Sequence, residues 1–176
     1  MSDRGALGRY FEELEGGESF ETRGRTIAEA DLVSFSALTG DWHPQHADAE
    51  WAEAGPFGSR VAHGMLLLSY SLGLAPIDPE RVVALRGLDS VRFKRPVRIG
   101  ETIRVRGAVR ELRPLDDQTG LVTLDWKVLG QSGAVAVRAE LQAIRRRRPQ
   151  AEPSGATPIE AEGDELSPLQ GGRVLV

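Results

Sequence analysis

Apolar residues in the first part of the chain recur at the spacing of a helix. Thr26 and Glu29 precede this run at the spacing of a capping box, which satisfies the free N–H groups at a helix start. The pattern predicts a helix over residues 27–38, and Gly40 can end it in a left-handed conformation. The predicted buried face consists of Ile27, Ala30, Val33 and Ala37.

A second helix is predicted over residues 61–74, where the sequence is apolar almost all round. Such a helix has to be surrounded by protein rather than lie on a surface. Between the two helices the polar residues 41–46 predict an ordered loop, and a short helix is expected at about residues 47–54.

From Val82 onward apolar and polar residues alternate, as in strands with one solvated face. Turn residues at 116–120 and 130–133 separate the strands, which is typical of antiparallel hairpins. A short edge strand is also expected at 18–22. An antiparallel sheet that wraps around one buried helix is the hot-dog arrangement, so we predict a single hot-dog fold of the α+β class. The strand pattern rests on Val91 and Phe93, on Ile103, Val105 and Val109, on Val122, Leu124, Trp126 and Val128, and on Val135, Val137, Ala139 and Leu141.

Beyond Ile144 the sequence changes character: a basic run, Arg145 to Arg148, leads into a stretch rich in proline and acidic residues. We therefore expect a folded domain over residues 1–146 and a disordered tail over 147–176. The basic run could contact a phosphate group, but a charged strand end that leads into solvent explains it as well.

Composition excludes several classes of protein. A chain of 176 residues with a formal net charge of −4 lacks the basic surplus of nucleic-acid-binding proteins. It contains no cysteine, so it can form neither disulfides nor thiolate metal sites. We find no signal-like or membrane-spanning apolar stretch, and we expect a cytoplasmic protein without membrane contact.

All three histidines, His43, His46 and His63, lie between the first helix and the start of the second, together with Asp41. Histidine exchanges protons near neutral pH, and a nearby carboxylate can share a water molecule with it. Pro44 stiffens the intervening segment, so Asp41 and His46 can converge. The same residues could instead serve as a helix cap and a half-buried imidazole, or Asp41, His43 and His46 could bind a metal.

Gly64 stands at the start of the apolar helix. The first N–H groups of a helix have no partner within it and point toward an acceptor, so a ligand carbonyl could bind there. Glycine would let the ligand approach the backbone, although close packing against a neighbouring element is an alternative reason for it.

Three runs resemble a known family: TGDWHPQHAD at 39–48, FGSRVAHGM at 57–65 and SVRFKRPVRIGETI at 90–103. They are similar to the hydratase motif, the HGM signature and the following strand of MaoC-like dehydratases and (R)-specific enoyl-CoA hydratases. The resemblance extends over about residues 10–144. One position departs from the family, in which Asn is usual where this chain has His43.

The resemblance implies a hydratase/dehydratase that interconverts 2-enoyl-CoA and (R)-3-hydroxyacyl-CoA thioesters. Asp41 and His46 would activate the water, and the amide of Gly64 would polarise the thioester carbonyl as an oxyanion hole. His43, Pro44 and His63 would bind substrate or support these groups. No metal and no cofactor is expected, because coenzyme A is part of the substrate.

Two other functions remain open beside the hydratase: a hot-dog acyl-CoA thioesterase, and a non-catalytic subunit that binds acyl groups. A single hot-dog sheet leaves one edge unpaired, so we expect a homodimer or a higher homo-oligomer. Arg92, Lys94, Arg104 and Arg106 form a predicted basic strand face that could bind the phosphates of coenzyme A.

Overall fold

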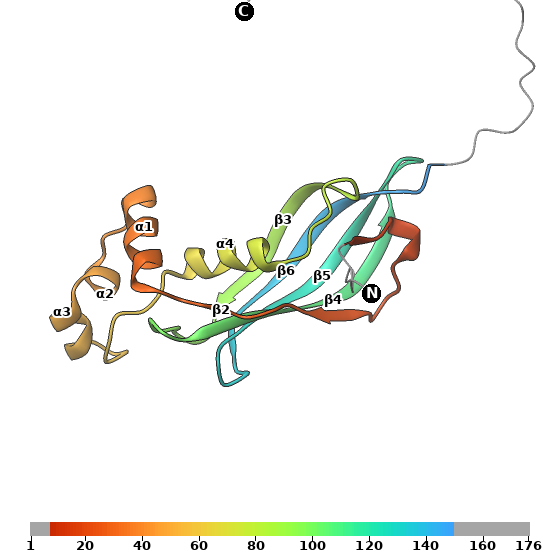
Figure 1. The fold of residues 1–176 in the computed structure, drawn as a ribbon. Coiled ribbons are helices and arrows are strands. Elements are labelled where there is room, and N and C mark those ends of the chain that lie inside the picture. Colours follow the sequence, from red (N-terminus) through yellow and green to blue (C-terminus); the bar gives the residue numbers. More distant parts are fainter. Residues whose placement is uncertain (1–7, 150–176) are drawn as a thin grey trace, which may run out of the picture.

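The computed structural model describes residues 8–149 (Figure 1). Among these residues it has five helical segments and six strands. The helical segments are η2 (Phe11–Glu13, a 3-10 helix), α1 (Glu29–Thr39), α2 (Pro44–Ala47), α3 (Ala49–Ala54) and α4 (Gly64–Leu74). The strands are β1 (Ser19–Glu21), β2 (Arg25–Thr26), β3 (Val82–Phe93), β4 (Thr102–Pro114), β5 (Thr119–Leu129) and β6 (Val135–Arg146).

The strands form one antiparallel sheet in the order β1-β4-β5-β6-β3, and β2 pairs with β4 beside this path. The sheet curves around α4, which lies along its concave face (Figure 1). Helices α1, α2 and α3 gather beyond the N-terminal end of α4. A helix wrapped by an antiparallel sheet is the predicted hot-dog arrangement in the α+β class, and the prediction is confirmed.

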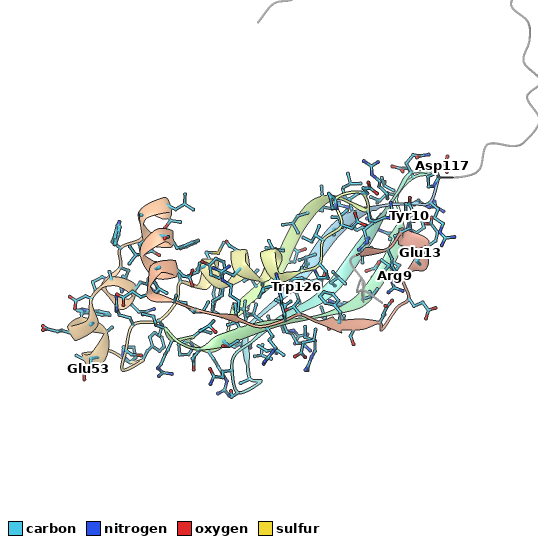
Figure 2. The ribbon with its side chains drawn as sticks, viewed as in Figure 1. Arg9, Tyr10, Glu13, Glu53, Asp117 and Trp126 are labelled. Carbon is cyan, nitrogen blue, oxygen red and sulfur yellow. The ribbon has the colours of Figure 1, made fainter. Side chains whose placement is uncertain are left out.

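The central contact between helix and sheet is made by Trp126, whose side chain is buried between β5 and α4 (Figure 2). Its indole Nε1–H donates to the hydroxyl of Ser71, 2.9 Å away, and Ser71 in turn donates to the Leu68 carbonyl. Both polar groups are buried and both are paired, as stable cores require. This bond joins α4 to β5.

The prediction for the first helix was wrong in its start, and of its predicted buried residues only Ile27, which precedes the helix, is buried. The helix begins at Glu29, where Asp31 rather than Glu29 accepts the free N–H of the Ala28 cap. Thr26 belongs to β2, where it pairs with Thr102 of β4, and the two hydroxyls are hydrogen-bonded. Leu32 and Ser36 are the buried side chains, whereas Val33 is 48% exposed. Where the chain packs, rather than its own periodicity, decides which face is covered.

Two further boundaries differ from the predictions. Residues 44–47 form the short helix α2 instead of a loop, because Pro44 is favourable at the first helical position. Helix α4 begins at Gly64 rather than at residue 61. It is not covered on all sides in the single chain, since Met65 is 57% exposed.

The basic run after Ile144 does not lead freely into solvent. Arg145 is fully buried at the end of β6, while Arg147 pairs with Glu12 at 2.7 Å and Arg148 pairs with Glu13. The run therefore joins the end of the sheet to η2. Figure 2 shows Glu13 of that helix near the far end of the sheet. Most of the predicted tail, residues 150–176, lies outside the described residues.

No helix between residues 8 and 149 is long and apolar enough to cross a membrane.

Candidate functional site

The predicted catalytic loop begins where α1 ends. Gly40 adopts a left-handed conformation with φ of 77°, as the sequence predicted, and turns the chain out of the helix. Asp41 follows it directly and is exposed. One of its carboxylate oxygens, Oδ1, accepts the backbone N–H of His43 at 3.2 Å, which restricts the side chain to one side of the loop.

His43 caps the helix that carries His46. Its Nδ1 accepts the backbone N–H of Gln45 at 3.1 Å, the bond that an Asn side chain makes at the same position of a helix. The ring lies edge-on to Trp51, with 5.4 Å between centroids, and 6.2 Å from the ring of His46. His43 therefore supplies a capping bond of the kind that Asn can make, and Pro44 follows it as the first helical residue.

His46 is held in one tautomer. Its Nδ1 lies 2.7 Å from the carbonyl oxygen of Val61, and a carbonyl can only accept, so Nδ1 carries the proton and donates. This leaves a lone pair on Nε2. The half-buried ring can therefore take a proton at Nε2 without losing the bond that orients it.

His63 lies directly against His46. The two rings stack with 3.8 Å between centroids and 25° between planes. The Nε2–H of His63 donates to the backbone carbonyl of Asp41 at 3.1 Å, and the buried hydroxyl of Ser36 lies 3.1 Å from the same nitrogen. Burial lowers the pKa of His63 below its ordinary value, so the ring stays neutral near pH 7. It links α1, the Asp41 loop and the start of α4.

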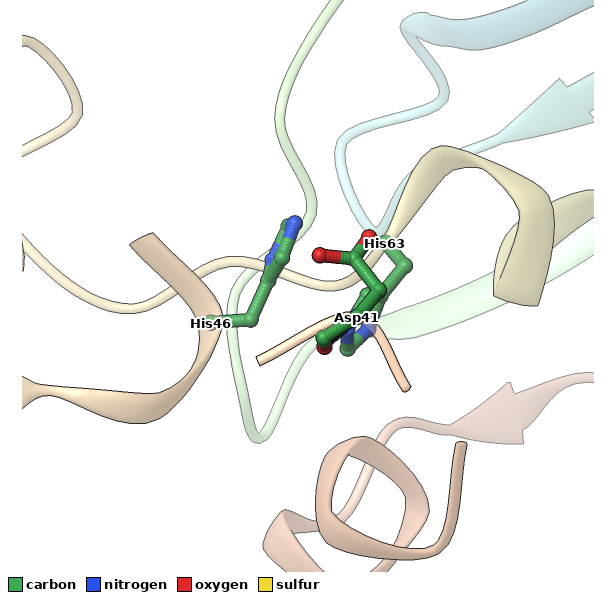
Figure 3. Close-up of side chains that lie close together, drawn as sticks. All are labelled: Asp41, His46 and His63. Carbon is green, nitrogen blue, oxygen red and sulfur yellow. Dashed lines mark hydrogen bonds between the residues drawn. The ribbon is translucent and has the colours of Figure 1, made fainter. Parts of the chain in front are cut away.

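Asp41, His46 and His63 converge on one small volume (Figure 3). One possible ligand atom from each residue lies within 4.8 Å of the other two. Figure 3 shows the carboxylate of Asp41 and the ring of His46 reaching toward the same space. All three residues line a cavity of about 740 Å³. Most of its remaining wall is apolar and includes Phe35, Phe57, Val61, Leu67 and Val97.

Gly64 lines the same cavity at the first position of α4. Within residues 8–149 no group accepts its backbone N–H, as expected for the first N–H of a helix. The ring of Phe93 packs against its Cα: a Cβ at Gly64 would come within 2.6 Å of Phe93 Cε1. Gly64 therefore packs closely against Phe93, and its backbone N–H is also left without an acceptor among the described residues.

The residues that could bind a metal differ from those predicted from the sequence. The structure brings His63, rather than His43, together with Asp41 and His46. The rings of His46 and His63 stack at 3.8 Å with 25° between their planes, whereas two imidazoles that bind one ion direct their in-plane lone pairs at a common point. Two of the four ring nitrogens also donate to backbone carbonyls. The arrangement does not fit a metal, and the absence of one stays a prediction.

Two contributors to the site were missed by the sequence analysis. Ser36 occupies a buried position of α1, and a hydroxyl inside an apolar face is a signal that it has a polar partner. Phe93 was assigned to the buried face of its strand, yet it is 53% exposed and lies over Gly64. No local pattern predicts that contact, because 29 positions separate the two residues.

Known proteins are similar to this chain over a segment that includes the candidate site. The MaoC like domain family matches residues 13–131. Protein MaoC of Klebsiella aerogenes is 44% identical over 101 residues, 56% of this chain and 30% of that protein. A 3-hydroxybutyryl-CoA dehydratase of Methylorubrum extorquens is 39% identical over 108 residues, 60% of this chain and 66% of the relative. An (R)-specific enoyl-CoA hydratase of Rhodospirillum rubrum is 34% identical over 117 residues, 65% of this chain and 78% of the relative. The chain thus spans under a third of the first relative and about two thirds of the second.

Solved structures agree with this result. An R-hydratase from Pseudomonas aeruginosa superposes with a TM-score of 0.64 at 31% identity, over 87% of this chain and 96% of that one. A double hot-dog protein from Mycobacterium tuberculosis gives 0.72 at 22% identity, over 88% and 48%, which concerns the fold alone. The family match covers more than half of the chain, and the chain belongs to the family of MaoC-like dehydratase domains.

Proposed function

We propose that the protein hydrates 2-enoyl thioesters and dehydrates the corresponding (R)-3-hydroxyacyl thioesters, with coenzyme A as the thiol. The family and the names of its relatives support a hydratase or dehydratase. The observation that carries the assignment to this chain is the convergence of Asp41 and His46 on one cavity, beside the Gly64 N–H, which has no acceptor within residues 8–149.

His46 is the proton acceptor in this proposal. Because Nδ1 donates to Val61, Nε2 is the free base, and it takes a proton from water as the water oxygen bonds Cβ of the enoyl group. The proton held on Nε2 then moves to Cα on the same face, so His46 returns to its neutral form and the sum of the steps is the addition of one water. In the reverse direction His46 gives the proton to the departing hydroxyl.

Asp41 orients the water. Its carboxylate can accept the second O–H of the molecule that His46 deprotonates. A separation within 4.8 Å between the two side chains allows one water to bond both, since each bond needs about 2.8 Å. The stacked, neutral His63 keeps the His46 ring in place while the latter becomes charged.

The backbone N–H of Gly64 is the hydrogen-bond donor to the thioester oxygen in this proposal. Attack at Cβ moves negative charge onto the thioester oxygen, and the unpaired N–H at the start of α4 can donate to it. The dipole of this eleven-residue helix favours negative charge at that end. One such donor contributes about 3 kcal/mol to a developing oxyanion.

The test is to mix the protein with crotonyl-CoA and follow the absorbance of the conjugated enoyl thioester, with free thiol measured in parallel. Loss of absorbance without free thiol, giving (R)-3-hydroxybutyryl-CoA, is the expected result. Release of thiol would instead identify a thioesterase, and no change in either signal would leave the acyl-binding subunit.

We also propose that the active form is a homodimer. Among the described residues β3 pairs with β6 alone, which leaves one edge of a twelve-residue strand open. Exposed apolar side chains gather there: Leu85 is 47% exposed, and Val83 and Phe93 are similarly open. A second copy that pairs along β3 would cover them and would also cover Met65 on α4.

A further inference from the structure

The cavity that contains Asp41 and His46 also has two cations in its wall, Lys94 and Arg95. They follow β3 directly, and both of their backbone N–H groups donate to the carbonyl of Ala136, at 2.7 and 3.3 Å. These bonds fix the backbone against the start of β6. The two charged side chains thus extend from an anchored segment, and both are exposed.

Neither cation is neutralised by a group in the part of the chain that the structure describes. Between residues 8 and 149, Lys94 and Arg95 have no ion pair and no side-chain hydrogen bond. Arg98, three residues further on, differs, because its guanidinium donates to Ser59 Oγ at 3.0 Å and to the Phe57 carbonyl at 2.8 Å. Lys94 and Arg95 are therefore available to an external anion, whereas Arg98 binds the segment that contains Phe57 and Ser59.

The structure also separates the members of the predicted basic strand face. Arg106 lies on the outer side of the sheet and pairs with Glu21 at 2.7 Å. Arg92 donates to its own strand at the Val91 carbonyl. Of the four cations in that prediction, Lys94 alone lines the cavity with the candidate catalytic residues.

Space for a larger group continues past Arg95. A second hollow of about 320 Å³ shares Arg95 and Pro96 with the main cavity and is further lined by Arg98, Gln131 and Ser132. A ligand that enters the main cavity can therefore extend over the loop toward polar side chains. The carboxylate of Asp41 repels an anionic end from the reacting part of the cavity, so the charges also set the direction of binding.

We infer that Lys94 and Arg95 bind the phosphate of a phosphorylated pantetheine arm, while the acyl group occupies the apolar part of the cavity. This inference rests on the proposed function. An arginine can donate two parallel hydrogen bonds to a phosphate, and a lysine adds a mobile point charge. Coenzyme A and an acyl carrier protein both present this phosphate, and coenzyme A adds a nucleotide with further phosphates.

The test compares three thioesters with the same acyl group: crotonyl-pantetheine, crotonyl-4′-phosphopantetheine and crotonyl-CoA. The Lys94→Gln/Arg95→Gln double variant is compared with the wild type in kcat and KM. The ratio of kcat/KM for crotonyl-CoA to that for crotonyl-pantetheine should fall roughly tenfold in the variant, through KM, as expected for two partly exposed contacts with phosphate. The matched control, Arg104→Gln/Lys127→Gln, removes two cations outside the cavity and should keep the wild-type ratio.

The middle substrate assigns the phosphate. If the double variant also lowers the ratio of kcat/KM for crotonyl-4′-phosphopantetheine to that for crotonyl-pantetheine, the two cations contact the phosphate that both carriers share. A fall with crotonyl-CoA alone overturns the inference, because the two cations would then contact the nucleotide phosphates and not the phosphate that both carriers share. An equal loss with all three thioesters, or no loss with any of them, overturns the inference.

A failure of the proposed function would be recognised separately. If the wild type turns over none of the three thioesters, binding of coenzyme A and of pantetheine is measured by calorimetry. Coenzyme A that binds more tightly than pantetheine, with the difference lost in the Lys94→Gln/Arg95→Gln variant, would still support the phosphate site. Equal binding of both molecules, or binding of neither, would overturn it.

Discussion

At the scale of single residues, the site depends on which imidazole can change its charge. His46 has a free ring nitrogen on the cavity side, whereas the buried ring of His63 is kept neutral and is fixed by Ser36 and the Asp41 carbonyl. Two stacked imidazole rings cannot both become positively charged without repulsion. The neutral ring thus lets its neighbour take the proton.

The lowered pKa of His63 predicts how stability depends on pH. The unfolded chain binds a proton near pH 6.5, while the native ring resists it to lower pH. Above about pH 6.5 the His63 ring is neutral in both states, so it does not lower the free energy of unfolding. That free energy falls as the pH drops from about 6.5 toward the lower native pKa. In His63→Phe, which keeps a ring against His46, the fall from about pH 7.5 to about pH 5.5 should be smaller. Urea unfolding at the two pH values measures this, and identical falls in both proteins would contradict it.

The residues of the site differ in how far the sequence predicts them. Asp41, His46 and Gly64 were selected because their motif and spacing resemble a family, and the structure brings them to one cavity. His43 was expected to bind substrate or support the site, and the structure gives it the role of a helix cap. Ser36 escaped prediction because its significance depends on His63, 27 positions away.

At the scale of elements, the start of α4 must accommodate both Phe93 and the substrate. In Gly64→Ala the new methyl group would clash with the Phe93 ring, so the free energy of unfolding should fall by about 1–2 kcal/mol. In Gly64→Ala/Phe93→Ala this fall should be smaller than the sum of the two single changes. The rate with crotonyl-CoA should nevertheless stay low, because the methyl group still obstructs the approach to the amide. Recovery of the rate of Phe93→Ala in the double variant would mean that Gly64 serves packing alone.

The bond between Ser71 and Trp126 couples α4 to β5. In Ser71→Ala a buried indole N–H loses its acceptor, which should lower the free energy of unfolding by about 1–3 kcal/mol. In a Trp126→Phe background the same substitution should cost much less, because no donor is left unpaired. Thermal or urea unfolding of the four proteins gives this coupling. Equal costs in both backgrounds would show that the bond does not join the two elements.

The strands were more predictable than the helices. Alternation in residues 103–141 reflects a sheet with one buried face, and the turns at 116–120 and 130–133 lie where β4, β5 and β6 are connected. The face of α1 was not predictable from its own residues. Its neighbours are Ile27, Leu66 and Val97, which come from other segments and cover Leu32 instead of Val33.

At the scale of the whole molecule, the open edge of β3 predicts the oligomeric state. Size-exclusion chromatography with light scattering should give at least a dimer. Leu85→Lys places a charge on that edge and should favour the monomer, because pairing would bury it without a partner. Leu115→Lys is the matched control at an exposed apolar residue between β4 and β5, and it should leave the dimer intact. A wild-type monomer would contradict the proposal.

The overall architecture follows from two features of the sequence, a nearly all-apolar helix and a meander of alternating strands. The contact between the basic run, Arg145 to Arg148, and η2 does not follow from these two features. There the basic run meets acidic residues of η2, more than 130 positions earlier in the chain, and Arg145 is buried. Long-range pairing of this kind leaves no periodic trace, which is why the run was expected to lead into solvent.

The central claim is that Asp41 and His46 act on one water molecule, and a double-mutant comparison tests it most directly. The measurement is kcat/KM for crotonyl-CoA in the wild type, Asp41→Asn, His46→Gln and the double variant. Each single change should cost about 10²- to 10⁴-fold, and the double variant should be hardly worse than the poorer single one, because the two groups work as a unit. Wild-type rates in either single variant, or losses that multiply in the double variant, would contradict a shared water between these side chains.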